Sequence, residues 1–240
     1  MHFTKLQASG NDFIVVEHQL DIDYSILATE VCHRHYGIGA DGLLVLDSKN
    51  KKLDIYNADG SIAKMCGNGL RCIGAYLSRV EGECSWDIEV GERRVRVERE
   101  HSLYYVYIGK IASMEYIEKQ YHDIHIPMYL VDLGARHLVL WNEVSLDHIE
   151  ALQREYDCNV NIVEVISSKE CIVNTYERGV GWTWACGSGA CASYYVLKNM
   201  CNMEDTILIH QIGGDVLVRI QEEELVLVGG ADYIFEGEYV

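Results

Sequence analysis

Two cysteines, each followed by a glycine-rich turn, are the residues of this sequence best suited to chemistry. One stretch reads Met65-Cys66-Gly67-Asn68-Gly69-Leu70-Arg71-Cys72, and the other reads Ala185-Cys186-Gly187-Ser188-Gly189-Ala190-Cys191. Both contain Cys-Gly-(Asn/Ser)-Gly, and both lead into a stretch that is typical of a helix. A helix N-terminus lowers the pKa of a cysteine thiol from its free value of about 8.5 toward neutrality. Either cysteine could therefore take up or release a proton at neutral pH.

The backbone of each turn suits a carboxylate ligand. Glycines let the chain turn tightly and approach a ligand closely, and the first N–H groups of a helix have no intrahelical acceptor, so they can hold an anion. Two such turns face to face would form a carboxylate cradle with one thiol on each side. That arrangement can remove a proton from one face of a carbon and return a proton to the other face.

The two turns occupy matching places in an internal repeat. Cys66 and Cys186 lie 120 residues apart in a chain of 240 residues, and Tyr56 and Tyr176 each precede their cysteine by ten residues. A repeat at half the chain length predicts two similar halves that bring their turns together.

Composition narrows the class of protein. Hydrophobic residues make up 49% and charged residues 24% of the chain, as in an ordinary globular protein with a substantial core. The net charge is −17, and no basic stripe interrupts it, so we expect neither nucleic acid nor a membrane as a partner. An anionic substrate would have to be held by local dipoles and a placed arginine.

Cysteine usage and the chain start indicate a cytoplasmic protein. The first residues show no signal-peptide pattern, and no apolar stretch is long enough for a membrane helix. Nine cysteines cannot all pair in disulfides, which favours a reducing compartment. The cysteine spacing supports no zinc site, so we expect no metal.

The elements that must position the turns repeat in the same order. In the first half we expect a helix over Tyr24–His35, a tight turn over Gly37–Gly42, a strand over Leu53–Tyr56 and a helix near Gly69–Arg79. The second half is predicted to contain a helix over Leu146–Tyr156, strands over Asn159–Ile166 and Glu170–Tyr176, and a helix that follows Cys186 to about Lys198.

These elements predict an α+β protein with two pseudo-symmetric domains. We expect each domain to be a curled, mostly antiparallel sheet around a central helix, with the active site in the cleft between them. The expected boundaries are residues 1–115, which carry Cys66, and residues 116–240, which carry Cys186.

The combined motifs resemble the diaminopimelate epimerase family of cofactor-independent amino-acid racemases and epimerases. Besides the two cysteine turns, the stretches that carry the resemblance are Gly10-Asn11-Asp12-Phe13, Gly37-Ile38-Gly39-Ala40-Asp41-Gly42, Tyr56-Asn57-Ala58-Asp59-Gly60-Ser61, Asn159-Val160-Asn161 and Glu177-Arg178-Gly179-Val180-Gly181. They run in order from residue 10 to residue 191, and this combination is highly specific.

The resemblance implies a role for each matching residue. Cys66 and Cys186 are the acid–base pair, with His137 and Glu177 beside the thiols to set their protonation. The backbone of four residues holds the carboxylate at the reacting carbon, namely Gly67, Asn68, Gly187 and Ser188. Five side chains contact the substrate, namely Asn11, Asn57, Asn159, Glu177 and Arg178. The resemblance implies that the partner is a small-molecule amino-acid substrate and that no cofactor is needed. It leaves open whether the protein forms a homodimer.

Two departures from the family pattern concern the substrate. The chain has Gly134-Ala135-Arg136-His137 where the family has Gly-Asn-Pro-His, and Gly181-Trp182-Thr183 where the family usually has Gly-Glu-Thr. Diaminopimelate, converted from LL to meso in the lysine and peptidoglycan pathway, is the default substrate. Histidine or a basic amino acid is the alternative. An isomerase like the phenazine-pathway relatives is disfavoured by the paired cysteines, and a non-catalytic amino-acid-binding protein of the same fold ranks below the enzyme.

Each candidate residue also has a purely structural interpretation. Either cysteine could be a small core residue at a helix start, and His137 alone would more often be a buried structural histidine. Glu177 and Arg178 could be a surface pair of little energetic value. Trp182 and Trp184 could line a pocket wall or fill the core.

Overall fold

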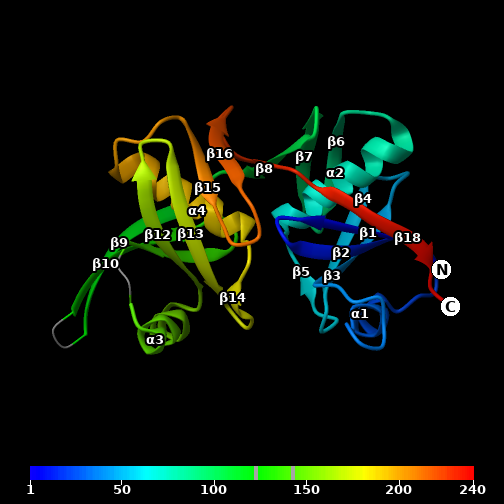
Figure 1. Cartoon of the computed structure of the whole chain (residues 1–240), viewed down its shortest axis with the longest axis horizontal. Helices are drawn as coiled ribbons and strands as arrows, with labels where there is room; N and C mark the ends of the chain where they lie inside the picture. Colours follow the sequence, from blue (N-terminus) through cyan, green and yellow to red (C-terminus); the bar gives the residue numbers. More distant parts are fainter. Residues whose placement is uncertain (122–123, 142–143) are drawn as a thin grey trace. The chain divides into compact units, whose positions relative to one another are not determined.

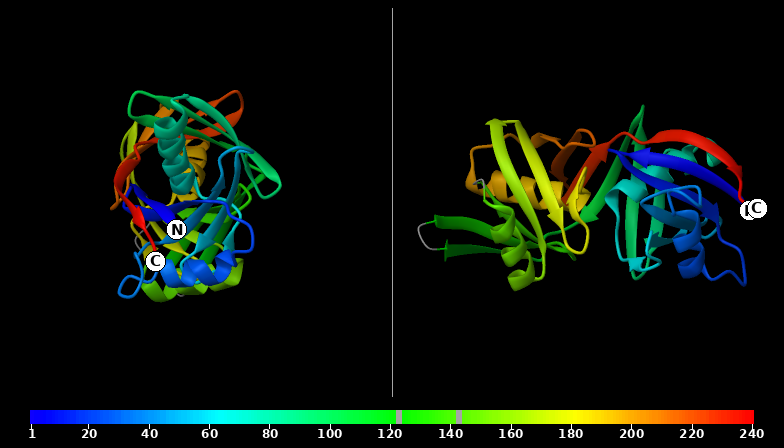
Figure 2. Two further views of the ribbon diagram at one scale, coloured as in Figure 1. Left: turned by 90° about the vertical axis from the view of Figure 1, so that its right-hand side faces the viewer. Right: turned by 60° about the horizontal axis from the view of Figure 1, so that its bottom comes forward.

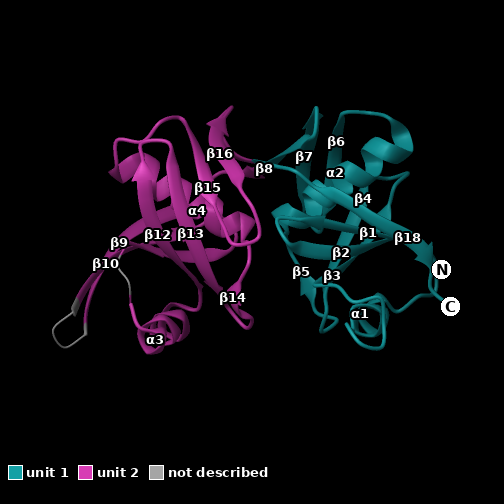
Figure 3. Cartoon of the chain, viewed as in Figure 1, with its two compact units in different colours: residues 1–107, 228–240 teal, residues 108–227 magenta. Residues whose placement is uncertain are grey.

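The computed structural model describes residues 1–121, 124–141 and 144–240, which form two compact units (Figure 3). Unit 1 contains residues 1–107 and 228–240, and unit 2 contains residues 108–227. The strands β8 (Leu103–Gly109) and β17 (Glu224–Gly229) each continue across a boundary between the units. The mixture of helices and strands confirms the α+β class.

Unit 1 places one long helix within a curled sheet (Figure 1). Its remaining elements are β1 (His2–Ala8), β2 (Asn11–Glu17), α1 (Tyr24–Val31), β3 (Gly42–Asp47), β4 (Lys52–Asn57), β5 (Ile62–Ala63), α2 (Gly67–Glu81), β6 (Ser85–Val90), β7 (Arg93–Glu100) and β18 (Asp232–Glu238). The helix α2 contacts β1, β2, β7 and β18, and Figure 2 (left) shows strands around it.

The strand pairing in unit 1 is mostly antiparallel and follows the connections. Short turns join the antiparallel pairs β1–β2, β3–β4 and β6–β7. The parallel pairs β2–β3 and β4–β6 each span a helix, because a parallel partner can be reached only by a crossover. The crossover between β4 and β6 contains β5 and then α2, so the first turn of α2 lies shortly after the end of β5.

Unit 2 repeats the same order of elements. They are β9 (Ser113–Tyr121), β10 (Ile124–Asp132), β11 (Arg136–Leu140), α3 (Leu146–Tyr156), β12 (Asn159–Ser167), β13 (Glu170–Glu177), β14 (Gly181–Thr183), α4 (Gly187–Met200), β15 (Thr206–His210) and β16 (Val216–Gln221). The parallel pairs are β11–β12 and β13–β15, which correspond to β2–β3 and β4–β6. The helix α4 contacts β10, β11, β12, β13 and β16. Among the described residues, no helix is long and apolar enough to cross a membrane.

The burial pattern of the elements follows their periodicity. In β6 the residues alternate between exposed and buried, as expected for a strand with one face on the core. The helix predicted from Tyr24 is shorter than expected and ends at Val31. Its Ile26 is 57% exposed, whereas Val31 and Cys32 are buried. A helix of eight residues buries a narrow stripe, and Ile26 lies outside it.

The C-terminal strand belongs to unit 1 rather than to the second half. β18 pairs with β1 in the antiparallel sense, and the N-terminal amino group of Met1 donates to the carbonyl of Tyr239 at 2.7 Å. The two termini therefore lie side by side (Figures 1 and 2). In unit 2 the place of β18 is taken by β9, which pairs with β10. The chain passes from one compact unit to the other between residues 107 and 108 and again between residues 227 and 228. The division into residues 1–115 and 116–240 stays a prediction from the sequence.

Candidate active site

Each candidate cysteine is the N-cap of the long helix in its unit. The Cys66 sulfur accepts a hydrogen bond from the Gly69 backbone N–H at 3.3 Å, and the Cys186 sulfur accepts one from the Gly189 N–H at 3.4 Å. Both residues have the extended backbone that an N-cap requires. Because the positive end of the helix dipole lies at this position, each helix stabilises a thiolate over a thiol.

In unit 1 the turn between β1 and β2 brings Asn11 to the cysteine. The Asn11 Oδ1 atom lies 4.0 Å from the Cys66 sulfur and 3.4 Å from the Nδ2 atom of Asn68. The side chain of Cys66 is half-buried, and Asn68 is buried with Gly67. Three of the predicted substrate-contacting residues in this unit, Asn11, Gly67 and Asn68, are therefore gathered around one thiol.

Charged groups hold both of these asparagine side chains. The fully buried Arg71 donates to Asn68 Oδ1 at 2.5 Å, and Asn11 Nδ2 donates to Asp41 at 2.8 Å. Asp41 is itself paired with Arg34, which also binds Asp12. The two amides are thus fixed between a cation and a carboxylate, so that Asn68 directs its Nδ2 donor toward Asn11 Oδ1.

Asp12 is the most strongly perturbed carboxyl group near this half of the site. Burial raises the pKa of Asp12, but hydrogen bonds from Arg34 and Lys5 outweigh this effect and lower the pKa to about 2. Lys5 contributes an ion pair at 2.6 Å. The network therefore stays ionised at neutral pH and holds the β1–β2 turn in place.

Asn57 lies at the end of β4 and is exposed. It donates from Nδ2 to the Ser61 hydroxyl at 2.9 Å, within the turn that leads to β5. Its partner across the β3–β4 pair is Gly42. In unit 2 Glu177 occupies the corresponding end of β13, so Asn57 and Glu177 are the repeat-related residues before the two cysteine turns.

In unit 2 Glu177 and Cys186 form a hydrogen-bonded pair. Burial raises the pKa of the Glu177 carboxyl, and hydrogen bonds with Thr183 and Cys186 act in the opposite direction. The Thr183 hydroxyl donates to Glu177 Oε1 at 2.7 Å. A carboxyl group with a raised pKa next to a thiol is suited to exchange a proton with it.

His137 approaches the same cysteine through Ser188. The His137 Nε2 atom lies 3.0 Å from the Ser188 Oγ atom, which lies 3.5 Å from the Cys186 sulfur. His137 is fully buried, and burial lowers its pKa to about 4, so its ring is neutral at pH 7. Its Nδ1 atom lies 3.1 Å from the amide nitrogen of Asn161.

The remaining predicted residues of unit 2 lie at the rim of this cluster. The Asn159 Oδ1 atom accepts from the Arg178 backbone N–H at 2.9 Å, and Asn159 Nδ2 lies 3.4 Å from His137 Nε2. The Arg178 guanidinium is exposed and forms an ion pair with Asp157 at 2.7 Å. Gly187 and Ser188 form the first turn of α4. All predicted unit-2 residues are therefore near Cys186, although their roles stay predictions.

Sequence reasoning missed several residues that support the cysteines. Asn161, Arg71 and Thr183 each bind a predicted site residue directly, and Gln211 accepts the Cys186 backbone N–H at 2.7 Å. For Asn161 a signal existed, because it lies two residues from Asn159 on one strand and so shares its face. For Gln211 there was none, since it is 25 residues from Cys186.

The other cysteines differ from the two candidates. All nine thiols are free. Burial raises the pKa of Cys32 and Cys158 to about 11 and that of Cys171 to about 12, and it raises the pKa of Cys72 further. Buried neutral thiols are poor nucleophiles and poor bases. These four cysteines are therefore unsuited to acid–base chemistry, and of the others Cys84 is exposed.

The two tryptophans beyond β13 do not fill the core. Trp182 is 48% exposed and Trp184 is 65% exposed, so the core-filling interpretation was wrong. Trp182 packs edge-on against Tyr176, with ring centroids 5.4 Å apart. Trp184 is held by its carbonyl, which accepts the Gly213 N–H at 2.8 Å. Both rings are available to a ligand.

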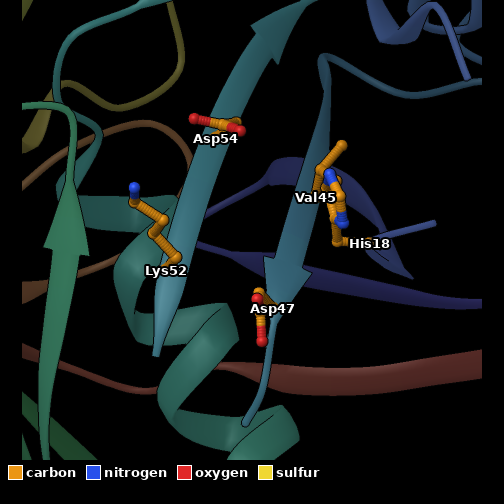
Figure 4. Close-up of a pocket in the computed structure, with 5 residues that line it drawn as sticks. All are labelled: His18, Val45, Asp47, Lys52 and Asp54. Atoms are coloured by element: carbon orange, nitrogen blue, oxygen red, sulfur yellow. The ribbon is translucent and has the colours of Figure 1, made fainter. Parts of the chain in front are cut away.

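A separate cavity lies on the sheet of unit 1. Its volume is about 250 Å³, and its lining residues are His18, Val45, Asp47, Lys52 and Asp54. Figure 4 shows these side chains on β3, on β4 and just after β2. None of the predicted site residues lines this cavity, so it is not part of the candidate active site.

The comparison with known proteins agrees with the resemblance seen in the motifs. The sequence model of the diaminopimelate epimerase family matches residues 3–113 and 153–234. The chain belongs to the diaminopimelate epimerase family. It is 30% identical to the diaminopimelate epimerase of Halothermothrix orenii, over 100% of this chain and 98% of that protein. It is 33% identical to the diaminopimelate epimerase of Caldanaerobacter subterraneus subsp. tengcongensis, over 99% of each chain.

Solved structures of other proteins share the fold of this family member. A phenazine biosynthesis protein from Bacillus anthracis superposes with a TM-score of 0.75 at 13% identity, over 100% of this chain and 99% of that one. A hydroxyproline epimerase from Agrobacterium vitis gives a TM-score of 0.69 at 14% identity, over 99% and 91%. At these identities the likeness shows the two-domain fold alone. Family membership identifies the protein as an isomerase of the epimerase type.

Proposed function

We propose that this protein epimerises diaminopimelate between its LL and meso forms without pyridoxal phosphate, using Cys66 and Cys186 as an acid–base pair. The observation that carries the proposal is the matched pair of N-cap cysteines. Each unit presents one thiol at the N-terminus of its long helix, with a glycine turn that leaves backbone N–H groups directed outward. This supports a role for both thiols at one substrate carbon.

The reaction requires one proton in and one proton out. The thiolate of one cysteine takes the hydrogen from the α-carbon, and the thiol of the other cysteine gives its proton to the opposite face. The enzyme ends with the two protonation states exchanged, and solvent restores them. Either cysteine acts first, depending on the configuration of the substrate. The two thiols titrate as a coupled pair.

The helix N-termini stabilise the carbanion that forms between these steps. The substrate carboxylate, which takes up part of the negative charge, is held by the N–H groups of Gly67, Asn68, Gly187 and Ser188. Fixed donors aimed at a developing charge in a dry site supply several kcal/mol of transition-state stabilisation. The positive ends of both helix dipoles act in the same sense.

The side chains beside the thiols adjust their protonation. Glu177 hydrogen bonds with Cys186 and has a raised pKa, so it can accept or return the thiol proton. His137 stays neutral and acts through Ser188. In unit 1 the side-chain Oδ1 atom of Asn11 lies 4.0 Å from the Cys66 sulfur and can accept a hydrogen bond from its thiol.

The far end of the substrate would meet the rim residues Asn57, Asn159 and Arg178. Arg136, which replaces a family proline and precedes His137, is exposed and adds a positive charge. A positive rim favours a second carboxylate, as in diaminopimelate, over a side chain that ends in a cation. Because Ala135 and Trp182 also depart from the family pattern, another amino acid such as histidine is the second candidate.

Hydrogen exchange in deuterated water tests this proposal. The protein is incubated with LL-diaminopimelate, with histidine and with basic amino acids. Mass spectrometry then detects deuterium at the α-carbon, and chiral chromatography detects inversion. Exchange with inversion of diaminopimelate is expected. Exchange with another amino acid alone would identify that substrate instead, and binding without any exchange, unaffected by Cys66→Ser or Cys186→Ser, would indicate a non-catalytic binding protein.

Cellular location and assembly belong to the same proposal. Nine free thiols suit a reducing cytoplasm, where we place the protein. Ile234 and Phe235 on β18 are about half exposed, which would suit contact with a second copy in a homodimer. Light scattering coupled to size-exclusion chromatography measures the mass, and a value of one chain would contradict the dimer.

A further inference from the structure

The orientation of one buried amide in unit 2 is fixed by its neighbours. Asn161 Nδ2 lies 3.0 Å from the carbonyl oxygen of Leu138, which can only accept a hydrogen bond. The atom at that distance must therefore be the amide nitrogen. Its Oδ1 atom then accepts from the Thr175 hydroxyl at 3.0 Å, and this hydroxyl can donate to it in that orientation.

This orientation determines which nitrogen of His137 carries the proton. The Asn161 amide nitrogen is a donor and lies 3.1 Å from His137 Nδ1, so Nδ1 must accept and the proton is on Nε2. On the other side of the ring, Asn159 Nδ2 lies at the longer distance of 3.4 Å and has the carbonyl of Arg136 as an acceptor. The Nε2–H group then donates to Ser188 Oγ at 3.0 Å.

We propose that Asn161 is a positioning residue that holds His137 as the Nε2–H tautomer and thereby directs the Ser188 hydroxyl proton onto the Cys186 sulfur. With Ser188 Oγ accepting from the ring, its own hydrogen is left to donate to the sulfur 3.5 Å away. The Cys186 thiolate thus receives two hydrogen bonds, one from Ser188 and one from the Gly189 N–H. Each such bond favours the thiolate over the thiol.

The packing around Asn161 leaves no room for another arrangement. Asn161 and His137 are fully buried, and Thr175 is 2% exposed. A side chain at Gly189 would place its Cβ 2.3 Å from Asn161 Oδ1 and 2.9 Å from the Thr175 hydroxyl, so α4 rests directly on this pair. The absence of a Cβ at Gly189 therefore allows the helix N-terminus and the amide to come together.

Two other ionisable groups act on this chain of hydrogen bonds. Glu177 on β13 hydrogen bonds with Cys186, and the negative charge of Asp132 on β10 favours a protonated His137 ring. Burial dominates for the ring and lowers its pKa to about 4, so the neutral tautomer persists at working pH. The chain from Thr175 to Cys186 then keeps one direction at neutral pH.

Nuclear magnetic resonance of the histidine rings tests the inference without any change to the protein. A two-bond proton–nitrogen correlation spectrum shows which ring nitrogen carries the proton, and the signal missing from His137→Gln identifies the residue. We expect the Nε2–H form at pH 7. A ring protonated at Nδ1, or at both nitrogens, would overturn the inference.

The variant Asn161→Asp reverses the direction of the chain. A carboxylate oxygen replaces the amide donor, so Nδ1 of His137 should take the proton and Nε2 should accept from Ser188. Ser188 would then no longer donate to Cys186, and the alkylation rate of Cys186 at pH 7, measured by peptide mass spectrometry, should fall about tenfold. Asn174→Asp, on the same strand pair but on the other face of β13, is the matched control and should leave the rate unchanged. An unaltered tautomer in Asn161→Asp would contradict the inference.

A double variant separates this positioning role from the new charge. If Asn161 acts through Ser188, then Ser188→Ala lowers the alkylation rate by itself, and adding Asn161→Asp lowers it no further. Rates that multiply would refute the inference. Under the proposed function kcat should fall with KM little changed in Asn161→Asp. The inference rests on that function only for its catalytic consequence, because the tautomer and the alkylation rate are measured without substrate.

Discussion

Replacement of Arg71 by methionine should destabilise unit 1 strongly. The guanidinium donates to three groups from three segments: Asn68 Oδ1 at 2.5 Å, Ser9 Oγ at 3.0 Å and the carbonyl of Gly230 at 2.9 Å. The side chain is fully buried, so water cannot replace it. Each bond contributes about 1 kcal/mol net, and the polar groups left behind add their own desolvation cost. Together these effects predict a loss of about 3–5 kcal/mol in the free energy of unfolding.

Urea unfolding followed by tryptophan fluorescence measures this loss. Trp86 is buried in unit 1 and reports on that unit. The matched control is Arg79→Met on the same helix, where the exposed guanidinium stacks on the Tyr233 ring at 4.1 Å. A surface contact of this kind contributes about 0.5–1 kcal/mol. If Arg71→Met costs no more than Arg79→Met, the buried network is not what holds the Asn68 turn.

Three further results are expected. Asp12 has a folded-state pKa of about 2, below its usual value, so its contribution to stability is present above about pH 4 and is lost as the pH falls toward 2. Urea unfolding across this pH range should show a loss of stability that the variant Asp12→Asn lacks. Gly189→Ala should reduce activity and lower the unfolding temperature, whereas Gly230→Ala should be tolerated, because its Cβ would meet only the Ser102 carbonyl oxygen, at an ordinary contact distance of 4.0 Å. Equal thermal shifts in the two variants would contradict the close packing at Gly189. Iodoacetamide should inactivate the enzyme by modifying Cys66 or Cys186, and substrate should protect; full activity after complete modification of both would refute the mechanism.

The sequence was sufficient to find the two cysteine turns and the helices that follow them. The repeat at half the chain length aligned Cys66 with Cys186, and both residues are N-caps in the structure. Helix and strand periodicity located the central elements because each buries one face on a core. The first of these helices was expected near Gly69–Arg79, and in the structure it begins two residues earlier, at Gly67, and ends at Glu81.

Contacts between residues far apart in the sequence could not be predicted in this way. Arg71 binds the carbonyl of Gly230, 159 residues away, and β18 returns to pair with β1. No local pattern encodes either pairing. Asn161 was visible as part of a motif, but its role depends on a carbonyl of the neighbouring strand and on a helix packed above it. Such roles follow only from three-dimensional structure.

The fate of the α-hydrogen during the first turnovers tests the central claim most directly. LL-diaminopimelate is incubated with the enzyme in deuterated water, and both the product and the remaining substrate are examined at low conversion. Two cysteines acting from opposite faces predict deuterium at the inverted carbon of the meso product and none in the remaining LL form. Deuterium that enters the remaining LL substrate as fast as the product would show that one base serves both faces, and the role of Cys66 and Cys186 as a pair would be contradicted.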